Sequence, residues 1–507
     1  MKIIINNIIL MEIFSILSII LIAILYSSYF FYKNSSRTLL VTSLSINIFL
    51  FQIVISFFGL LDYNSTYNLQ ITHFNLFDNL IINITRQLLW ENISFGIDVL
   101  SNIFALITIL LISIALIIGS NARVYGTMKF FIILVQIIEL MLLITFYTTD
   151  LFIFYLGFEG LTIPTFFLIF IYGAEVTKLR AAKFFLIYSF ISSTLLSFAI
   201  SLMYIQYQTT NLNQLLHIFL NDNSLTAERY IIIYLFLILG FGIKIPIVPF
   251  HMWLPEAHAE ASTAGSIILA GLILKLGGYG ILRFVLPLFS SFTIMYPYIQ
   301  TTSILGILIC SLSYFRTTNL KQIIAYTSII HMNIITLSLF SQHVLTITGG
   351  ILSMVSHSLI SSSLFICAGI LYNRFGTYEI QHFSGLNQTM PIFATFFIVL
   401  NLSNISLPLT FSFIGEFMIL IDLIKTNIYM FVIVLVLITL NTLYSLWILN
   451  RIVYSDLIVI NKNIKQLTQI QDIDLDEIYI LSLFLIFIIW LGIAPNNLLN
   501  LLVQYYN

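Results

Sequence analysis

The chain has 507 residues, of which 60% are hydrophobic and 8% are charged. Soluble domains carry about 25% charged residues, so the composition excludes a soluble protein and indicates a polytopic membrane protein. The net charge of −1 provides no basic surface for nucleic acid, which is therefore not an expected partner.

The N-terminus, MKIIINNIILMEIF, lacks the arginine- and serine-rich amphipathic pattern of a transit peptide. We therefore expect the first helix to remain in the protein. Phe and Tyr are abundant whereas Gly and Pro are scarce, which is the bias expected when A/T-rich codons dominate a gene. This bias fits an organellar genome.

Apolar runs long enough to cross a bilayer follow one another along the chain. They predict about fourteen transmembrane helices in an all-α polytopic fold. The spans lie near 13–32, 39–61, 98–119, 128–148, 150–172, 184–206, 230–250, 264–286, 295–314, 321–341, 344–372, 391–424, 427–450 and 479–503. The polar stretches at 62–95 and 451–478 are too short for soluble domains, so we expect a single transmembrane domain over 1–507.

Lysine and arginine are distributed unevenly over the predicted loops. Loops after odd-numbered spans hold 13 of the 20 basic residues, and the opposite side holds 5. Basic residues accumulate in loops that are not translocated, so we expect both termini on the outer, positive-potential side. The inner set is Lys33, Arg37, Arg123, Lys129, Lys178, Arg180, Lys183, Arg316, Lys321, Arg374, Arg451, Lys462 and Lys465; the outer set is Lys2, Arg86, Arg229, Arg283 and Lys425.

Five ionisable residues fall inside predicted spans: Glu139 in the fourth, Glu159 in the fifth, Lys244 in the seventh, Lys275 in the eighth and Glu416 in the twelfth. Each such group costs about 2.5–3.5 kcal/mol at the bilayer centre, so each needs a reason. One interpretation is a set of ion pairs that join helices. The interpretation we favour is a proton relay, in which small rearrangements of neighbouring charges load and unload protons. For Glu139 both interpretations stay open.

Two spans are predicted to be broken by proline. Pro246 and Pro249 follow Lys244 directly, so the seventh helix cannot remain regular there. Pro408 lies inside the long twelfth span, shortly before Glu416. Irregular backbone at membrane depth is tolerated only where it is buried in protein or lines a wet cavity, so both breaks should border water.

The two breaks lie five helices apart, a spacing that suggests repeats of opposite orientation, because an odd number of helices inverts the topology. We expect helices 4–8, residues 128–286, and helices 9–13, residues 295–450, to form these inverted five-helix repeats. Peripheral helices 1–3 would occupy 1–120, and a loop with the last helix would occupy 451–507.

Two histidines, His331 in the tenth span and His357 in the eleventh, lie among small polar residues that can hold ordered water. Imidazole both donates and accepts protons near neutral pH, which suits a relay. The alternative is a histidine that only bridges two helices by hydrogen bonds.

His251, His258 and Glu260 lie in a proline-containing loop without a further ligand, so we do not expect a metal site. Trp253 in the same loop is expected to be an interfacial anchor, and Ser262 is placed to cap the eighth helix. The sequence has no dinucleotide-binding glycine motif and no P-loop, so no NADH, flavin or iron–sulfur cluster is expected in this chain. Cys310 and Cys367 both fall within apolar spans and are expected to be small core residues.

The stretch KIPIVPFHMWLPEAHAEASTAGSIILAGLILKLGGYGILRF resembles the signature region of the antiporter-like proton-pumping membrane subunits of respiratory complex I, NADH:ubiquinone oxidoreductase. The resemblance continues through FYLGFEGLTIPTFFLI, TTNLKQIIAYTSIIHM, SHSLISSSLFICAGILYNR and NISLPLTFSFIGEFMIL, and covers about residues 95 to 450. Lys275 followed by LGGYG favours the chain 4 branch of this family.

The resemblance implies that Glu159 and Lys244 form the charge pair of an input half-channel. It also implies that Lys275 is the central lysine and that Glu416 is the terminal acid of the output half. His331 and His357 match family histidines along the hydrated axis between them. Glu139 matches no such position.

The resemblance further implies redox chemistry in other subunits, which would bind FMN, iron–sulfur clusters and ubiquinone. The expected partners are other membrane subunits of the complex, including sister antiporter-like subunits, and lipids. The expected location is the mitochondrial inner membrane, as a multi-pass, organelle-encoded protein with both termini on the intermembrane-space side.

Two positions depart from the family pattern, since Ser262 stands where proline is usual and Asn319 replaces an acid. The alternatives that stay open are a sister antiporter-like subunit, a stand-alone cation/proton antiporter, and a structural scaffold or quinone-binding subunit.

Overall fold

The computed structural model describes residues 35–60, 94–121, 128–173, 177–221, 227–290, 292–341, 343–456 and 471–506. These residues form helices and connecting turns, and no strand occurs among them. The predicted all-α fold is therefore confirmed. The predicted first span and most of the polar stretches at 62–95 and 451–478 lie outside the described residues.

Ten helical segments of the described chain are long and apolar enough to cross a membrane. They are 99–120, 128–147, 151–172, 178–207, 263–288, 293–314, 320–339, 344–375, 428–454 and 475–493, and each overlaps one predicted span. Shorter apolar helices at 39–55, 230–244 and 391–404 coincide with three more predicted spans. The structure and the hydropathy pattern thus agree on every span that is described.

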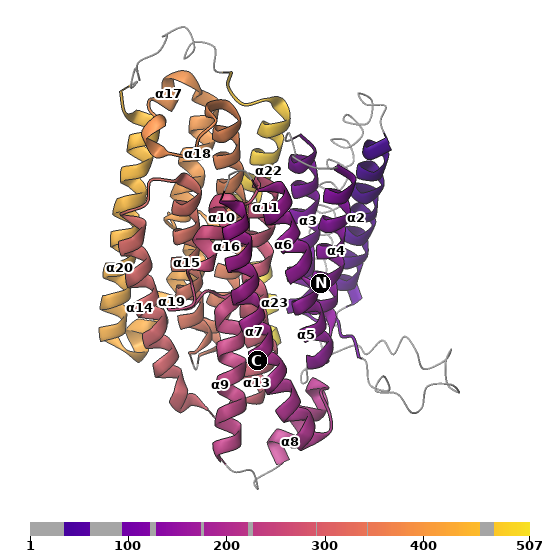
Figure 1. Ribbon diagram of the computed structural model, residues 1–507. Helices are drawn as coiled ribbons and strands as arrows, with labels where there is room; N and C mark the ends of the chain where they lie inside the picture. Colours follow the sequence, from indigo (N-terminus) through magenta and orange to yellow (C-terminus); the bar gives the residue numbers. More distant parts are fainter. Residues whose placement is uncertain are drawn as a thin grey trace. The chain divides into compact units, whose positions relative to one another are not determined.

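The chain divides into two compact units, and within each the helices run alongside one another (Figure 1). Unit 1 comprises 1–172, 186–241 and 279–291. Its helices are α2 (Ser35–Leu60), α3 (Val99–Asn121), α4 (Met128–Tyr147), α5 (Leu151–Gly160), α6 (Thr162–Tyr172), α8 (Leu212–Asn221), α13 (Leu286–Leu288) and most of α7 (Lys178–Tyr207) and α9 (Ala227–Lys244).

Unit 2 comprises 173–185, 242–278 and 292–507. Its helices are α10 (Trp253–Glu260), α11 (Thr263–Ile268), most of α12 (Leu274–Gly280), α14 (Tyr296–Tyr314), α15 (Leu320–Leu339), α16 (Val344–Phe375), α17 (Leu386–Thr389), α18 (Pro391–Asn404), α19 (Phe411–Thr426), α20 (Ile428–Leu449), α22 (Leu475–Ile493) and α23 (Asn496–Tyr506). Residues 128–286, the predicted first repeat, contribute to both units. The predicted domain and repeat organisation stays a prediction.

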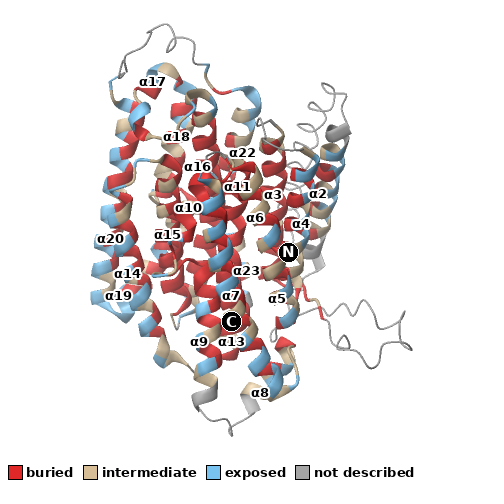
Figure 2. Cartoon of the chain, in the orientation of Figure 1, coloured by how far each residue is buried: buried red, intermediate tan, exposed pale blue. Residues whose placement is uncertain are grey.

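Helix α16 is the core of unit 2, and Figure 2 shows it buried, whereas α20 carries exposed faces. It is unusually rich in serine for a buried helix. The Oγ atoms of Ser361 and Ser362 donate to backbone carbonyls one turn earlier, over 2.6 Å each. Hydroxyls satisfied within their own helix can be buried at small cost. The helix therefore carries a polar yet fully packed surface.

The first predicted break is present, because α9 ends at Lys244 and α10 begins only at Trp253. The indole of Trp253 donates its Nε1–H to the carbonyl of Ile243 over 3.0 Å and packs against Phe185. Trp253 is 2% exposed, so its prediction as an interfacial anchor is wrong. The last carbonyls of a helix need partners, and a buried indole supplies one here.

The proposed loop around His258 is also corrected, since His258 and Glu260 lie in α10 and only His251 lies in the break. The described residues contain no group of three or more histidine, cysteine or acidic side chains that could hold a metal ion.

The second predicted break separates α18 from α19 around Pro408. The Oγ of Ser412 donates to the carbonyl of Ser403 at the end of α18, and the amide of Leu407 donates to the carbonyl of Leu402. Ser406 and Leu409 adopt positive φ angles of 62° and 78°. Such conformations are costly away from glycine and cluster at functional sites.

The eighth span is not one regular helix, which hydropathy did not predict. Two π-helical segments, η1 (Leu269–Ile273) and η2 (Ile281–Val285), flank α12, and Ser262 caps the N-terminus of α11 as predicted. Arg283, counted above with the outer loops, lies buried in η2 and pairs with Asp98. The arginine is stabilised inside the span by this carboxylate.

Candidate functional site

The two acids of unit 1 have different surroundings. Glu139 on α4 is 2% exposed. With the amide of Asn47 on α2 in its flipped orientation, which satisfies its neighbours, Asn47 donates an N–H to Oε2 of Glu139 over 2.9 Å. Glu159 near the end of α5 is only partly buried, and Tyr155 lies one turn earlier on the same helix. Glu139 is therefore an interhelical contact in this structure, whereas Glu159 stands at the junction of α5 and α6.

Lys244 is the last residue of α9 and is 2% exposed. Its Nζ lies 5.1 Å from the centre of the Phe185 ring, within the range of a cation–π interaction. A cation at a helix C-terminus also interacts favourably with the helix dipole. Lys244 belongs to unit 2 and Glu159 to unit 1, so the predicted charge pair between them stays a prediction.

Lys275 lies on α12, directly after the π-helical segment η1, and is 1% exposed. Its Nζ donates to the carbonyl of Ala270 over 2.6 Å and lies 2.8 Å from Nδ1 of His357 on α16. The π-helical register helps to place Ala270 within reach, because it alters which carbonyls the following turn satisfies. The central lysine and a predicted histidine are thus in direct contact.

The other predicted histidine contacts the predicted terminal acid. Nδ1 of His331 on α15 lies 2.9 Å from Oε1 of Glu416 on α19, and both residues are less than 10% exposed. Hydrogen bonds to a carboxylate are stronger than those between neutral groups. Glu416 lies in the second turn of α19, and the break between α18 and α19 determines where that helix begins.

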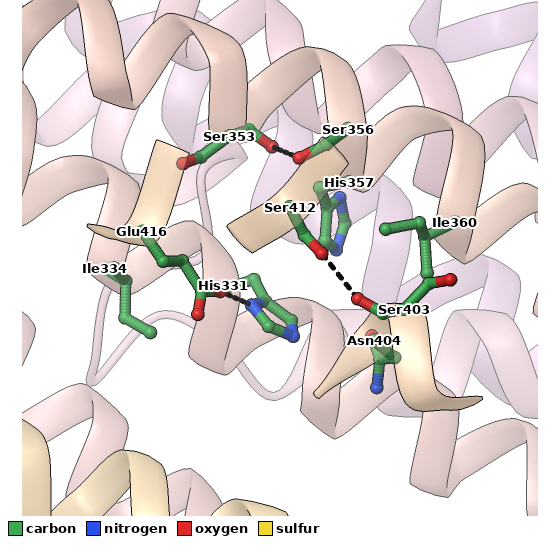
Figure 3. Close-up of a pocket in the computed structure, with 10 residues that line it drawn as sticks. All are labelled: His331, Ile334, Ser353, Ser356, His357, Ile360, Ser403, Asn404, Ser412 and Glu416. Carbon is green, nitrogen blue, oxygen red and sulfur yellow. Dashed lines mark hydrogen bonds and ion pairs between the residues drawn. The ribbon is translucent and has the colours of Figure 1, made fainter. Parts of the chain in front are cut away.

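The two contacts meet at a small cavity in unit 2 (Figure 3). His331, His357 and Glu416 line it together with Ile334, Ser353, Ser356, Ile360, Ser403, Asn404 and Ser412. Its volume of about 10 Å³ is enough for one water molecule. Ser403, Asn404 and Ser412 flank the second break, so this break borders the cavity. That both breaks border water stays a prediction.

The two imidazole rings lie 5.8 Å apart between centroids. In each ring Nδ1 has a partner, while Nε2 is buried and has no hydrogen-bond partner among the described residues. Imidazole can accept a proton at one nitrogen and release one from the other. The order of groups is therefore Lys275, His357, cavity, His331, Glu416, and each neighbouring pair can exchange a proton directly or through one water.

Some features of this site were not predicted from the sequence. Asn404 and the cavity-lining serines carried no motif, and only their place beside the broken twelfth span could have indicated them. His258 is completely buried, with its ring stacked 4.5 Å from that of Phe365, and neither ring nitrogen has a partner among the described residues. Neither the periodicity of the sequence nor the distance of seventeen residues from Lys275 predicted that His258 would be buried without a polar partner.

The two residues that depart from the family pattern, Asn319 and Ser262, both cap helices. The side chain of Asn319 accepts the amide of Lys321 at the start of α15, and the Oγ of Ser262 accepts the amide of Gly265. Asparagine and serine cap helices about as well as aspartate. Cys310 and Cys367 are free and buried, as expected.

Sequence comparison supports the resemblance. The profile of the family described as NADH:quinone oxidoreductase/Mrp antiporter, TM, matches residues 148–441. NADH-ubiquinone oxidoreductase chain 4 of Chondrus crispus is 41% identical over 406 residues, which is 80% of each chain. NADH-ubiquinone oxidoreductase chain 4 of Arabidopsis thaliana is 40% identical over 421 residues, which is 82% of each.

Structural comparison gives similar folds. A chain of respiratory complex I from Thermus thermophilus with bound NADH matches with a TM-score of 0.72 and 25% identity, over 81% of this chain and 85% of that one. A chain of the Mrp complex from Dietzia sp. DQ12-45-1b matches with a TM-score of 0.81 over 97% of both, at 18% identity, which shows a common fold alone.

Proposed function

The chain belongs to the NADH:quinone oxidoreductase/Mrp antiporter transmembrane family, and we propose that it is the chain 4 subunit of respiratory complex I. In this proposal the chain moves protons across the membrane through buried lysine, histidine and glutamate side chains. The energy comes from redox chemistry in other subunits of the complex.

The observation that carries the proposal is the pair of contacts in unit 2. Lys275 contacts His357, Glu416 contacts His331, and the two histidines line one cavity. Buried ion pairs between helices would join lysine directly to glutamate, whereas here two titratable imidazoles and room for a water separate them. This sequence of groups favours a proton relay over a structural ion pair.

The loading step is assigned to Glu159 and Lys244. Moving one proton against 100 mV costs about 2.3 kcal/mol, which corresponds to a change of about 50-fold in a proton-binding equilibrium. Making or breaking an opposite-charge contact at about 4 Å changes proton affinity by this amount or more. The segment that follows Lys244 is not a regular helix. This supports a role in which Lys244 changes position, either contacting Glu159 or lowering the proton affinity of Lys275.

The chain itself is proposed to be free of redox centres. FMN, iron–sulfur clusters and ubiquinone would be bound by other subunits, because this sequence has no nucleotide-binding motif and its two cysteines are buried in separate helices. The partners would be other membrane subunits, including sister antiporter-like subunits, and lipids. The proposed location is the mitochondrial inner membrane, with both termini on the intermembrane-space side.

Copurification tests the proposal. The tagged chain, extracted in mild detergent, should migrate with a large assembly that contains flavin and oxidises NADH with ubiquinone. Isolation of the chain without flavin would contradict its assignment to complex I.

A stand-alone or Mrp-type cation/proton antiporter is the second candidate, because the fold also matches a chain of an Mrp complex. Vesicles separate the two functions. An antiporter would move protons in exchange for an imposed sodium gradient, whereas the complex I subunit would move them only when NADH is oxidised.

A further inference from the structure

A second buried carboxylate, Asp422, lies on α19 beyond Glu416, and the relay described above does not use it. Asp422 is 4% exposed, and its Oδ2 accepts the hydroxyl of Thr346 on α16 over 2.6 Å. Its Oδ1 lies 3.8 Å from Nε2 of His343. No lysine or arginine of the described chain forms a salt bridge with it. A carboxylate buried without a permanent cation is costly and is seldom retained for packing alone.

His343 connects this carboxylate to the surface. It is the residue before the first turn of α16, and 55% of its side chain is exposed. An imidazole can accept a proton at one ring nitrogen and release one from the other. Asp422 therefore has one oxygen on a buried hydroxyl and the other facing a histidine in contact with water.

The cluster of Thr346, Asp422 and His343 continues the interface that holds the cavity. Thr346 precedes Ser353 by two turns and His357 by three turns on α16, so all three lie on about the same face. On α19, Asp422 follows Glu416 by six residues, a rise of about 9 Å. The cluster thus shares one face of α16 with two residues of the cavity, Ser353 and His357.

Small residues separate the cluster from the cavity. A Cβ atom added to Gly415 would lie 2.3 Å from the Oγ of Ser353 and 2.8 Å from the carbonyl of Gly349. A Cβ added to Gly349 would lie 2.9 Å from Cβ of Met418. The two helices therefore approach closely through glycines, and this contact separates the cluster from the cavity without a larger side chain between the two backbones.

The cluster also lies at the end of unit 2 that is predicted to face the outer side. Lys425, one turn after Asp422, belongs to the outer set of basic residues and is exposed. The loop that holds His343 follows the tenth span and belongs to the same predicted side. A proton that reaches Asp422 has therefore travelled from the cavity toward the outer surface.

We propose that Asp422 and His343 form the proton-release end of the relay in unit 2. This inference rests on the proposed function. The proton leaves the carboxyl group of Glu416 and binds the carboxylate of Asp422, in a step that requires α16 and α19 to separate at the glycine contact and admit water. Nε2 of His343 then takes it up, and Nδ1 of the same ring releases one proton to the outer solution. The exposed ring regains its first tautomer by proton exchange with that solution, and Glu416 regains its proton from His331.

The test uses the assembled complex in liposomes, with the proton-to-electron ratio measured during NADH oxidation. Asp422→Asn keeps a carbonyl that accepts the Thr346 hydroxyl but cannot carry a proton. We expect it to lower the ratio to the value given by Glu416→Gln, and the double variant to lower it no further, because both groups serve one path. Lys425→Gln, the matched change at the neighbouring exposed cation, should leave the ratio unchanged.

Two further variants separate release from a structural clamp. Thr346→Val removes the hydrogen bond but keeps the acid, so the proton-to-electron ratio should stay close to that of the wild type. If Asp422 only held α19 against α16, Thr346→Val would instead be more harmful than Asp422→Asn. His343→Gln, at an exposed position that tolerates substitution, should lower the ratio even if Asp422→Asn assembles poorly.

The inference is overturned if assembled His343→Gln and Asp422→Asn complexes pump at the wild-type ratio while Glu416→Gln does not. A wild-type ratio in Glu416→Gln would instead overturn the relay of the proposed function, and the release site with it.

Discussion

Nζ of Lys275 lies 2.8 Å from Nδ1 of His357, although the two residues are 82 positions apart in the sequence. The contact engages one ring nitrogen of His357 and leaves the other for the cavity that also touches His331. A lysine that only neutralised a carboxylate would not need an imidazole as its partner. The contact therefore supports the proposed proton-carrying role, which substitution of Lys275 tests first.

The first prediction concerns Lys275. Lys275→Arg keeps a positive charge, but a guanidinium does not release its proton at any working pH. We expect Lys275→Arg and Lys275→Ala to assemble and to lose coupled proton pumping to a similar extent, measured as the proton-to-electron ratio in liposomes.

The matched control is Lys321→Arg, because Lys321 is another buried lysine whose ammonium donates to a backbone carbonyl, that of Ala261. It should pump like the wild type. Normal pumping by Lys275→Arg would rule out proton transfer through this lysine.

The second prediction concerns Glu416. Glu416→Gln preserves shape and can still hydrogen-bond to His331, yet it cannot bind and release a proton. We expect coupled pumping to fall strongly, with Glu416→Asp intermediate because the shorter side chain weakens a contact worth about 1.5–3 kcal/mol. Equal pumping by the Gln and Asp variants, at equal assembly, would contradict the relay assignment.

The third prediction concerns Glu159. In the proposed loading step, opening of the contact between Lys244 and the Glu159 carboxylate frees Lys244 to act on Lys275. Glu159→Gln should therefore impair pumping although it preserves size and polarity, and Glu159→Asp should retain more activity. Both are measured as the rate of proton uptake per NADH oxidised. Were the two variants to pump equally well, the charge-pair switch would have to be abandoned.

The fourth prediction concerns the first helix break. Trp253→Phe keeps an aromatic ring against Phe185 but leaves the Ile243 carbonyl without its donor. We expect a loss of about 1 kcal/mol of stability, seen as a lower unfolding temperature of the assembled complex, with the proton-to-electron ratio retained. Trp253→Ala should cost about 3–5 kcal/mol, since it also empties a packed site. Unchanged stability in both would contradict the capping role of the indole.

The fifth prediction concerns topology. Single cysteines introduced at Arg180 and Lys425, both exposed, should react with a membrane-impermeant thiol reagent from opposite sides, Arg180 from the inner side and Lys425 from the outer side. The native thiols of Cys310 and Cys367 are buried, so they provide a low background. Reaction of both introduced cysteines from one side would disprove the predicted span count between them.

Much of the fold could be predicted because lipid imposes a simple requirement on sequence. A helix that crosses the membrane has to present about 20 mostly apolar residues, and a proline in the middle of such a helix tends to interrupt it. The breaks near Lys244 and Glu416 and the cap at Ser262 follow from these local rules. Trp253 was misassigned because the same rules place an indole at an interface, whereas the orphaned carbonyl of Ile243 holds it inside.

The sequence by itself determined that this is a polytopic membrane protein, which residues carry charge inside it, and where two helices break, because these properties depend on hydropathy and local backbone chemistry. Only the tertiary structure decided which charged groups meet. It joined Lys275 to His357 and His331 to Glu416, paired Arg283 with Asp98, and placed Asp422 beside His343. Contacts between helices far apart in sequence depend on which faces pack together, and neither periodicity nor composition encodes that choice.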